Sequence, residues 1–252
     1  MAEAARARLL LIQPSEMDPP GPLADWLAEA GARIEHVRPE REPLPDLDGY
    51  QGVICLGGPM RTHDDAAHPW LADLRALLAG AVTDAVPTLT ICLGAQLLAV
   101  SVGGRVRPMP AGPEVGTLLV AKRDAAAGDP LFADAPFMPD VVQFHTDEVH
   151  VLPPNSELLA ASLRCSNQAF RIGNCAYGVQ FHIETTPELV LDWARTNPDM
   201  AELVAEAQFD EQHLIDAHAE IAETWRPFAH RFVELASGER APISPARSLP
   251  LA

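Results

Sequence analysis

Positive charge is scarce in this sequence. Its 252 residues include 18 Lys and Arg against 35 Asp and Glu, which gives a formal net charge of −17 at pH 7. Because a nucleic-acid backbone is itself polyanionic, this balance argues against nucleic acid as a partner. No apolar run reaches the roughly 18 residues that a membrane span needs, and residues 3–8 lack the apolar segment and cleavage site of a secretory signal. We therefore expect a cytoplasmic protein without a membrane partner.

Cysteine is also scarce, and the four cysteines stand singly, without the pair spacing of a metal site. Single cysteines suit a reducing compartment. The sequence further lacks the strand–GxxxxGK[ST]–helix pattern of a phosphate-binding loop. We expect no metal and no cofactor, and a structural role for Cys55, Cys165 and Cys175.

Alternating apolar and turn-forming segments predict an α/β fold. Strands are expected at residues 8–13, 34–37, 52–56 and 87–91, with helices at 23–30, 69–80 and 95–100. Alternation of this kind predicts right-handed crossovers and an open, mostly parallel sheet flanked by helices. After Gly103-Gly104, short β-like runs at 117–122, 141–144, 158–162, 169–172 and 176–181 predict antiparallel strands added beside it.

The last quarter of the chain has a different sequence pattern. Apolar residues between Leu214 and Leu235 recur at helical spacing, and Pro227 interrupts them, which predicts two helices rather than one. Their apolar face either docks on the sheet or forms a lid or partner surface near the site. We divide the chain into a domain at 1–197 and a helical extension at 198–252, whose end from residue 241 is expected to be a loose tail.

Cys92 lies where a buried strand turns into a helix. The run Leu89–Ile91 predicts the strand, and residues 95–100 are good helix formers. A thiol at such a turn lies at the positive end of the helix dipole, which favours the reactive thiolate. The Leu93 amide would face an oxyanion formed when the thiol attacks a carbonyl. The alternative is a small buried hydrophobe at the end of a core strand.

A second strand, predicted at residues 176–181, is followed by His182 and Glu184. Residues two apart in a strand face the same way, so the imidazole and the carboxylate can align. Cysteine, histidine and acid are the nucleophile, base and orienting group of acyl transfer. Glu184 also lies just before a predicted helix start, where N-terminal helix electrostatics alone would explain an acid.

Three segments together resemble the signatures of class I, triad-type glutamine amidotransferases, closest to stand-alone members related to the glutaminase domain of GMP synthase. They are Gly57–Met60 (GGPM), Ile91–Gln96 (ICLGAQ) and Gly178–Glu184 (GVQFHIE). The likeness extends through Asp64–Leu71, Phe144–Glu148 and Asn167–Arg171, and covers about residues 7–195. It implies a flavodoxin-like sheet and a Cys92–His182–Glu184 triad that hydrolyses glutamine and supplies ammonia to a separate synthetase or acceptor enzyme.

The resemblance also implies roles for pocket residues. Gly58 would supply a second oxyanion donor beside Leu93, although a Gly-Gly pair is also an ordinary tight turn. Gln96, one helical turn after Cys92, would help to hold glutamine, although it is equally consistent with a surface residue. Two positions depart from the family pattern, Thr90 in place of glycine and Ile183 in place of proline. We expect Thr90 to crowd the turn and open it slightly, but neither change removes a reacting group.

Three alternatives remain open from the sequence. His145 and Asp147 also follow a predicted strand and form a rival triad with Cys92, although in the family this loop lines the pocket and contacts substrate mainly through its main chain. The same triad cleaves γ-glutamyl amides or peptides in some stand-alone relatives, without a partner. A non-catalytic regulatory or binding subunit is the third alternative, and loss of a triad member would be its sign.

Overall fold

The computed structural model describes residues 7–243, so most of the predicted C-terminal tail lies outside the described residues. Its centre is an eight-stranded sheet in the order β2-β1-β3-β4-β12-β11-β10-β7. The parallel strands are β1 (Arg8–Ile12), β2 (Arg33–Val37), β3 (Gly52–Cys55), β4 (Thr88–Ile91) and β12 (Ala176–Val179). The sheet continues through β11 (Ala169–Ile172), β10 (Ser156–Ala161) and β7 (Ala121–Lys122), each antiparallel to its neighbour. The predicted mostly parallel α/β sheet with added antiparallel strands is confirmed.

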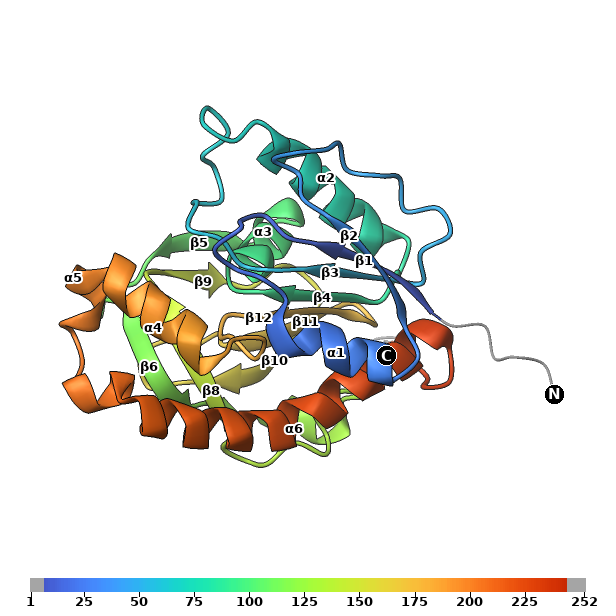
Figure 1. Ribbon diagram of the computed structural model, residues 1–252. Helices are drawn as coiled ribbons and strands as arrows, with labels where there is room; N and C mark the ends of the chain where they lie inside the picture. The colour runs from blue at the N-terminus through green and yellow to red at the C-terminus, as the bar shows by residue number, and fades with distance from the viewer. Residues whose placement is uncertain (1–6, 244–252) are drawn as a thin grey trace, which may run out of the picture.

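Helices cover both faces of this sheet (Figure 1). One face packs on α1 (Gly21–Glu29) and α6 (Glu211–Ser237), and the other on α2 (Trp70–Thr83) and α3 (Leu93–Ser101). Strand β1 shows why: Leu9 and Leu11 point to the first face, and Leu10 and Ile12 to the second, all fully buried. A strand buried on both faces is apolar without alternation, as these sequences are.

Two small antiparallel sheets lie beside the main one. Strand β5 (Arg105–Pro108) pairs with β9 (Asp147–Val151), and β6 (Glu114–Leu119) pairs with β8 (Asp140–His145). Strands β5 and β9 were not predicted, because they carry charged residues and little apolar periodicity. The run at 176–181 was predicted to be antiparallel, whereas β12 is parallel to β4 and antiparallel only to β11.

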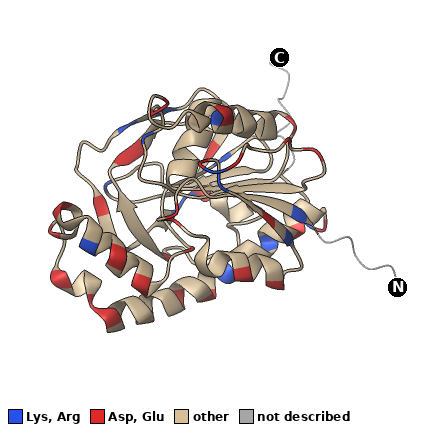
Figure 2. Cartoon of the chain, turned by 45° about the horizontal axis from the view of Figure 1, so that its top comes forward, with Lys and Arg blue, Asp and Glu red and all other residues tan. Residues whose placement is uncertain are grey.

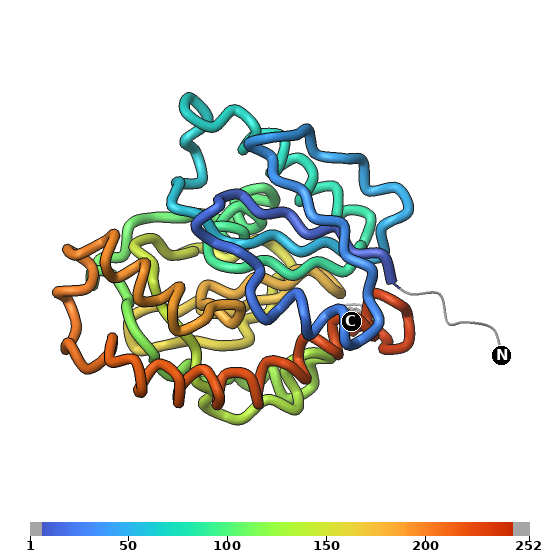
Figure 3. The backbone as a smooth tube through the Cα atoms, viewed as in Figure 1, coloured from blue at the N-terminus to red at the C-terminus, as the bar shows by residue number. Residues whose placement is uncertain are grey.

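The prediction of two helices separated by Pro227 is wrong, because α6 is one helix of 27 residues with Pro227 inside it. Proline removes one helical hydrogen bond and crowds the preceding turn. Burial outweighs this cost: Trp225 is 0% exposed, and its ring packs edge-on against Phe132 and Phe228. Its indole N–H also donates to the Asp140 carbonyl at 2.9 Å. The apolar face of α6 therefore docks on the sheet and beside α1, as the path of the chain in Figure 3 shows.

Shorter helices complete the chain. They are α4 (Pro187–Thr196), α5 (Pro198–Ala201) and the 3₁₀ turns η1 (Asp124–Gly128) and η2 (Glu206–Phe209). Acidic residues are spread over helices and loops, and basic residues form few, separate segments (Figure 2). Within residues 7–243, no helix is both long enough and apolar enough to cross a membrane.

Candidate active site

Cys92 lies on a strained turn between β4 and α3. Its backbone has φ 51° and ψ −111°, a conformation that side-chain-bearing residues rarely adopt. The turn is tight because α3 packs closely on β3: a Cβ at position 94 would clash with the Cys55 carbonyl, so only glycine fits there. Thr90 does not open the turn, since its side chain is buried and its hydroxyl donates to the Tyr177 carbonyl of β12 at 3.0 Å. The predicted turn from strand to helix at Cys92 is confirmed.

His182 and Glu184 form a buried pair just beyond the end of β12. His182 Nδ1 lies 2.7 Å from Glu184 Oε1, and the other carboxylate oxygen accepts from the Ile183 amide at 2.9 Å. The imidazole is 1% exposed, and its ring packs edge-on against Trp193 with centroids 4.8 Å apart. With Nδ1 donating to the carboxylate, Nε2 is the nitrogen left for proton exchange.

The charges around His182 favour its protonated form. Burial alone would lower the pKa of the imidazole, but the Glu184 carboxylate and the Cys92 thiol raise it well above its ordinary value through charge and hydrogen bonding. A protonated imidazole beside a cysteine is the arrangement that supports a thiolate nucleophile. Cys92 and His182 follow the neighbouring parallel strands β4 and β12, and both line the same cleft.

A cleft of about 220 Å³ opens beside the sulfur. Of the predicted site residues, Cys92, Leu93, Gln96, Gly58 and His182 line it, and Glu184 lies behind His182. Asn197 and Met200, from the C-terminal segment, form part of its wall. Among the described residues, the amides of Gly58 and Leu93 have no main-chain acceptor, and Leu93 is at the first position of α3, where helical amides lack intrahelical partners.

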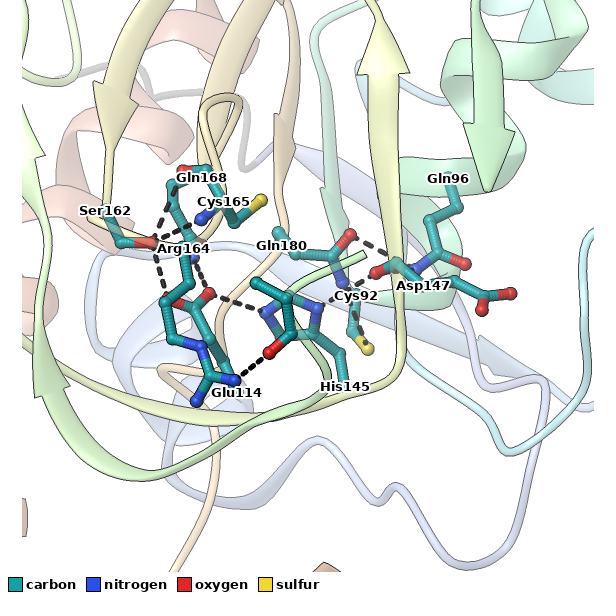
Figure 4. Close-up of polar contacts among 11 residues, drawn as sticks. Cys92, Gln96, Glu114, His145, Asp147, Ser162, Arg164, Cys165, Gln168 and Gln180 are labelled. Carbon is teal, nitrogen blue, oxygen red and sulfur yellow. Dashed lines mark hydrogen bonds and ion pairs between the residues drawn. The ribbon is translucent and has the colours of Figure 1, made fainter. Parts of the chain in front are cut away.

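Gln96 faces this cleft from α3 (Figure 4). Its Nε2 donates to the Asp147 carbonyl at 3.2 Å and to Gln180 Oε1 at 3.1 Å. These two bonds use both hydrogens of the amide, so only its carbonyl oxygen remains for a ligand. Gln96 can therefore accept a hydrogen bond from an ammonium or amide N–H group, but it cannot donate to a carboxylate.

His145 is held differently from His182. Its Nδ1 lies 2.9 Å from the Asp147 main-chain oxygen, and its Nε2 lies 3.2 Å from Glu114 Oε2. Neither nitrogen is free to take a proton from Cys92, and the Asp147 carboxylate is directed to Arg61, 3.9 Å away. The geometry disfavours the rival triad of Cys92, His145 and Asp147.

Asp18 is a site residue that the sequence analysis missed. It lies in the loop after β1 and lines the cleft, although the residue is only 7% exposed. A Cβ on Gly57 would lie 2.9 Å from Asp18 Oδ1 and 3.3 Å from His182 Cε1, so glycine there leaves room for both groups. Its place after a strand at the carboxyl edge of the sheet was the signal that could have identified it. Burial raises the pKa of Asp18 to about 6, with Glu184 adding to the increase and His182 opposing it.

We expect Asp18→Asn to change how stability depends on pH. Because the folded-state pKa of Asp18 is raised, its contribution to the free energy of unfolding is greatest below the ordinary aspartate pKa and is lost as pH rises through about 6. Above pH 7 the variant should be more stable than the wild type by about 3 kcal/mol. Urea unfolding from pH 4 to 8 measures the free energy of unfolding of the variant and the wild type, with the exposed Asp25→Asn as control. The same pH dependence in Asp18→Asn as in the wild type would contradict the prediction.

The described residues contain no group of three or more His, Cys, Asp or Glu side chains arranged to hold a metal ion. All four cysteines are free and buried.

Comparison with known proteins gives concordant similarities. Residues 22–190 match the family described as Glutamine amidotransferase class-I. The chain is 34% identical over 141 residues to a GMP synthase (glutamine-hydrolyzing) of Christiangramia forsetii, covering 55% of this chain and 26% of that protein. It is 27% identical over 188 residues to gamma-glutamyl peptidase 3 of Arabidopsis thaliana, covering 72% of this chain and 71% of the peptidase.

A solved structure is similar over almost the whole chain. The crystal structure of a glutamine amidotransferase from Thermotoga maritima superposes with a TM-score of 0.79 at 26% identity. The match covers 92% of this chain and 98% of that one. By contrast, the chain spans about a quarter of the length of the GMP synthase that it matches.

Proposed function

This chain belongs to the class-I glutamine amidotransferase family, and we propose that it hydrolyses the side-chain amide of glutamine through a thioester on Cys92. One observation carries the proposal: the thiol and the His182–Glu184 pair lie at the ends of adjacent parallel strands and border one cleft. A nucleophile, a base and a group that orients the base are the components that acyl transfer requires.

The reaction follows from the roles of these groups. The Cys92 thiolate attacks the amide carbon, and the Gly58 and Leu93 amides hold the oxyanion, each contributing about 3 kcal/mol to the transition state. His182 donates its proton to the leaving nitrogen, so ammonia departs as the C–N bond breaks. The same imidazole then takes a proton from water, whose oxygen attacks the thioester and releases glutamate and the thiolate. Glu184 holds the imidazole and stabilises its charge.

We propose that the ammonia is used by a separate acceptor enzyme. The GMP synthase that this chain resembles is nearly four times as long as the matched segment, and its name couples glutamine hydrolysis to synthesis. The sequence of this chain has no phosphate-binding loop that would support such a synthesis. A synthetase partner would then supply the acceptor.

A second candidate is hydrolysis of γ-glutamyl peptides by the same three residues. Two observations favour it. The similarity to a gamma-glutamyl peptidase extends over 71% of that protein, and the cleft wall includes Met17, Asn197 and Met200, which offer apolar and amide contacts to a group beyond the scissile bond. A non-catalytic role is the weakest candidate, because all three reacting groups are present and paired.

Product release from two substrates separates these candidates. We expect purified protein to release ammonia from glutamine, and the Cys92→Ala variant, assayed as a blank, to release none. A γ-glutamyl dipeptide assayed in parallel tests the second candidate through release of its free amino acid. Turnover of the dipeptide with glutamine inert would replace the first proposal by the second. Inactivity on both, with and without an added synthetase, would favour a non-catalytic subunit.

A further inference from the structure

The sulfur of Cys92 has a polar neighbour that the reaction above does not use. Gln180 Nε2 lies 3.6 Å from Cys92 Sγ, within hydrogen-bonding range for sulfur, and the Gln180 side chain is buried. Gln180 follows β12 and precedes His182 by two residues, so it projects from the same strand end. It is therefore positioned to donate to a thiolate, as the contact between the two side chains in Figure 4 shows.

The orientation of the Gln180 amide is fixed by its neighbours. Its oxygen accepts from Gln96 Nε2 at 3.1 Å, which leaves its nitrogen for the sulfur. Gln96 is held in turn, because its Nε2 also donates to the Asp147 carbonyl at 3.2 Å. If the Gln180 amide were turned over, two nitrogens would face each other and the amide oxygen would face the thiolate. The hydrogen bonds thus impose one direction on the chain of amides.

His145 anchors the far end of this chain. Its two ring nitrogens both face acceptors, namely the Asp147 carbonyl and the Glu114 carboxylate. The ring thus bridges Glu114 and the same Asp147 carbonyl that accepts from Gln96, so its position fixes that carbonyl.

Glu114 is surrounded by hydrogen-bond donors. It accepts from Ser162 Oγ at 2.6 Å and from Gln168 Nε2 at 2.6 Å, and its Oε2 lies 3.2 Å from His145 Nε2. Burial raises the pKa of Glu114, but the hydrogen bonds from His145 and Ser162, with charges on His145 and Arg164, bring it below its ordinary value. A carboxylate surrounded by donors stays ionised, and here it holds the His145 ring in place.

We propose that Gln180 is a further catalytic residue, the hydrogen-bond donor that holds the Cys92 thiolate, and that Glu114 and His145 are positioning residues that orient it through the Asp147 carbonyl and Gln96. This inference rests on the proposed function, since it concerns the nucleophile of that reaction. It also gives a role to the second buried His–Glu pair, which lies beside the cleft without reaching the sulfur.

Alkylation of Cys92 by iodoacetamide tests the donor directly. Hydrogen bonds to charged groups contribute enough that Gln180→Met should change the rate of alkylation at neutral pH by about 10-fold or more, with a displaced pH profile. The charged groups at the cleft, His182 with Glu184 behind it and Asp18 in the lining, are unchanged in this variant. Gln143→Met is the matched control, because Gln143 is fully buried and, in the described part of the chain, its side chain has no hydrogen-bond partner; it should react like the wild type.

A second variant guards against a folding defect. Gln180→Glu keeps the size of the side chain and an oxygen, but it replaces the donor with an anion, so its alkylation profile should move as well. Circular dichroism and thermal unfolding check that each variant is folded. Folded Gln180→Met and Gln180→Glu proteins with the wild-type rate and profile would overturn the role of Gln180.

Glu114→Gln tests the positioning role of Glu114 and His145. In this variant the rate and pH profile of Cys92 alkylation should shift in the same direction as in Gln180→Met, because the ring that fixes the Asp147 carbonyl loses its carboxylate partner. A folded Glu114→Gln protein with the wild-type alkylation rate and profile would overturn the positioning role. Alkylation requires no substrate. If the protein failed to hydrolyse glutamine, the proposed function would be refuted, but the alkylation experiment would still test the role of Gln180.

Discussion

Replacing His182 with asparagine is expected to lower kcat/KM for amide hydrolysis by about 10⁴-fold or more. The change removes the group that protonates the leaving nitrogen and later activates water. It also removes the positive charge beside the thiolate, where Glu184 and Cys92 now raise the pKa of the imidazole well above its ordinary value. Ammonia release at substrate concentrations well below KM measures the loss. Asparagine places an amide near the position of His182 Nδ1, so the Glu184 carboxylate keeps a hydrogen-bond donor.

His145→Asn is the matched comparison for this experiment. Both histidines are buried beside the same cleft and both pair with a glutamate. Because neither nitrogen of His145 faces the sulfur, we expect a loss of about 10-fold, through displaced Gln96 and Gln180 amides. Abolition of turnover in His145→Asn together with near-normal turnover in His182→Asn would reverse the assignment of the base.

Replacing Trp225 with alanine is expected to destabilise the whole chain by about 3–5 kcal/mol. The indole is fully buried between Phe132, Phe181 and Phe228, and its N–H donates to the Asp140 carbonyl. The truncation would leave a cavity, and the Asp140 carbonyl at the start of β8 would lose the indole donor. Urea unfolding followed by circular dichroism measures the change in the free energy of unfolding.

The same experiment tests the predicted boundary after residue 197. Because α6 shares one hydrophobic cluster with α1 and the sheet, we expect a single unfolding transition that moves as a unit in Trp225→Ala. Ile215→Ala, on the exposed side of the same helix at 46% exposure, should change stability by less than about 0.5 kcal/mol. A separate early transition, shifted alone by Trp225→Ala, would mean that the C-terminal segment folds as an independent extension.

Local sequence determined the elements that carry the site. The run into Cys92 predicts a strand and a helix because apolar, β-branched residues give way to helix formers across a turn, and Gly94 fits where α3 crosses Cys55. The spacing of His182 and Glu184 predicts that they can pair, and they do so at 2.7 Å. Pro227 misled the analysis because the penalty for proline is local, whereas the burial of Trp225 that outweighs it involves residues from distant segments.

The α/β class, the turn at Cys92 and the His–Glu pair could be predicted from the amino-acid sequence, since each depends on contacts within a few residues. The position of β12 beside β4 could not, nor could the cleft contacts of Asp18 and of the segment around Met200. The same holds for the hydrogen bonds that link Glu114, His145, the Asp147 carbonyl, Gln96 and Gln180. Strand order and side-chain hydrogen bonds join residues tens of positions apart. No local propensity encodes them, because they form only when the packed sheet brings those residues within reach.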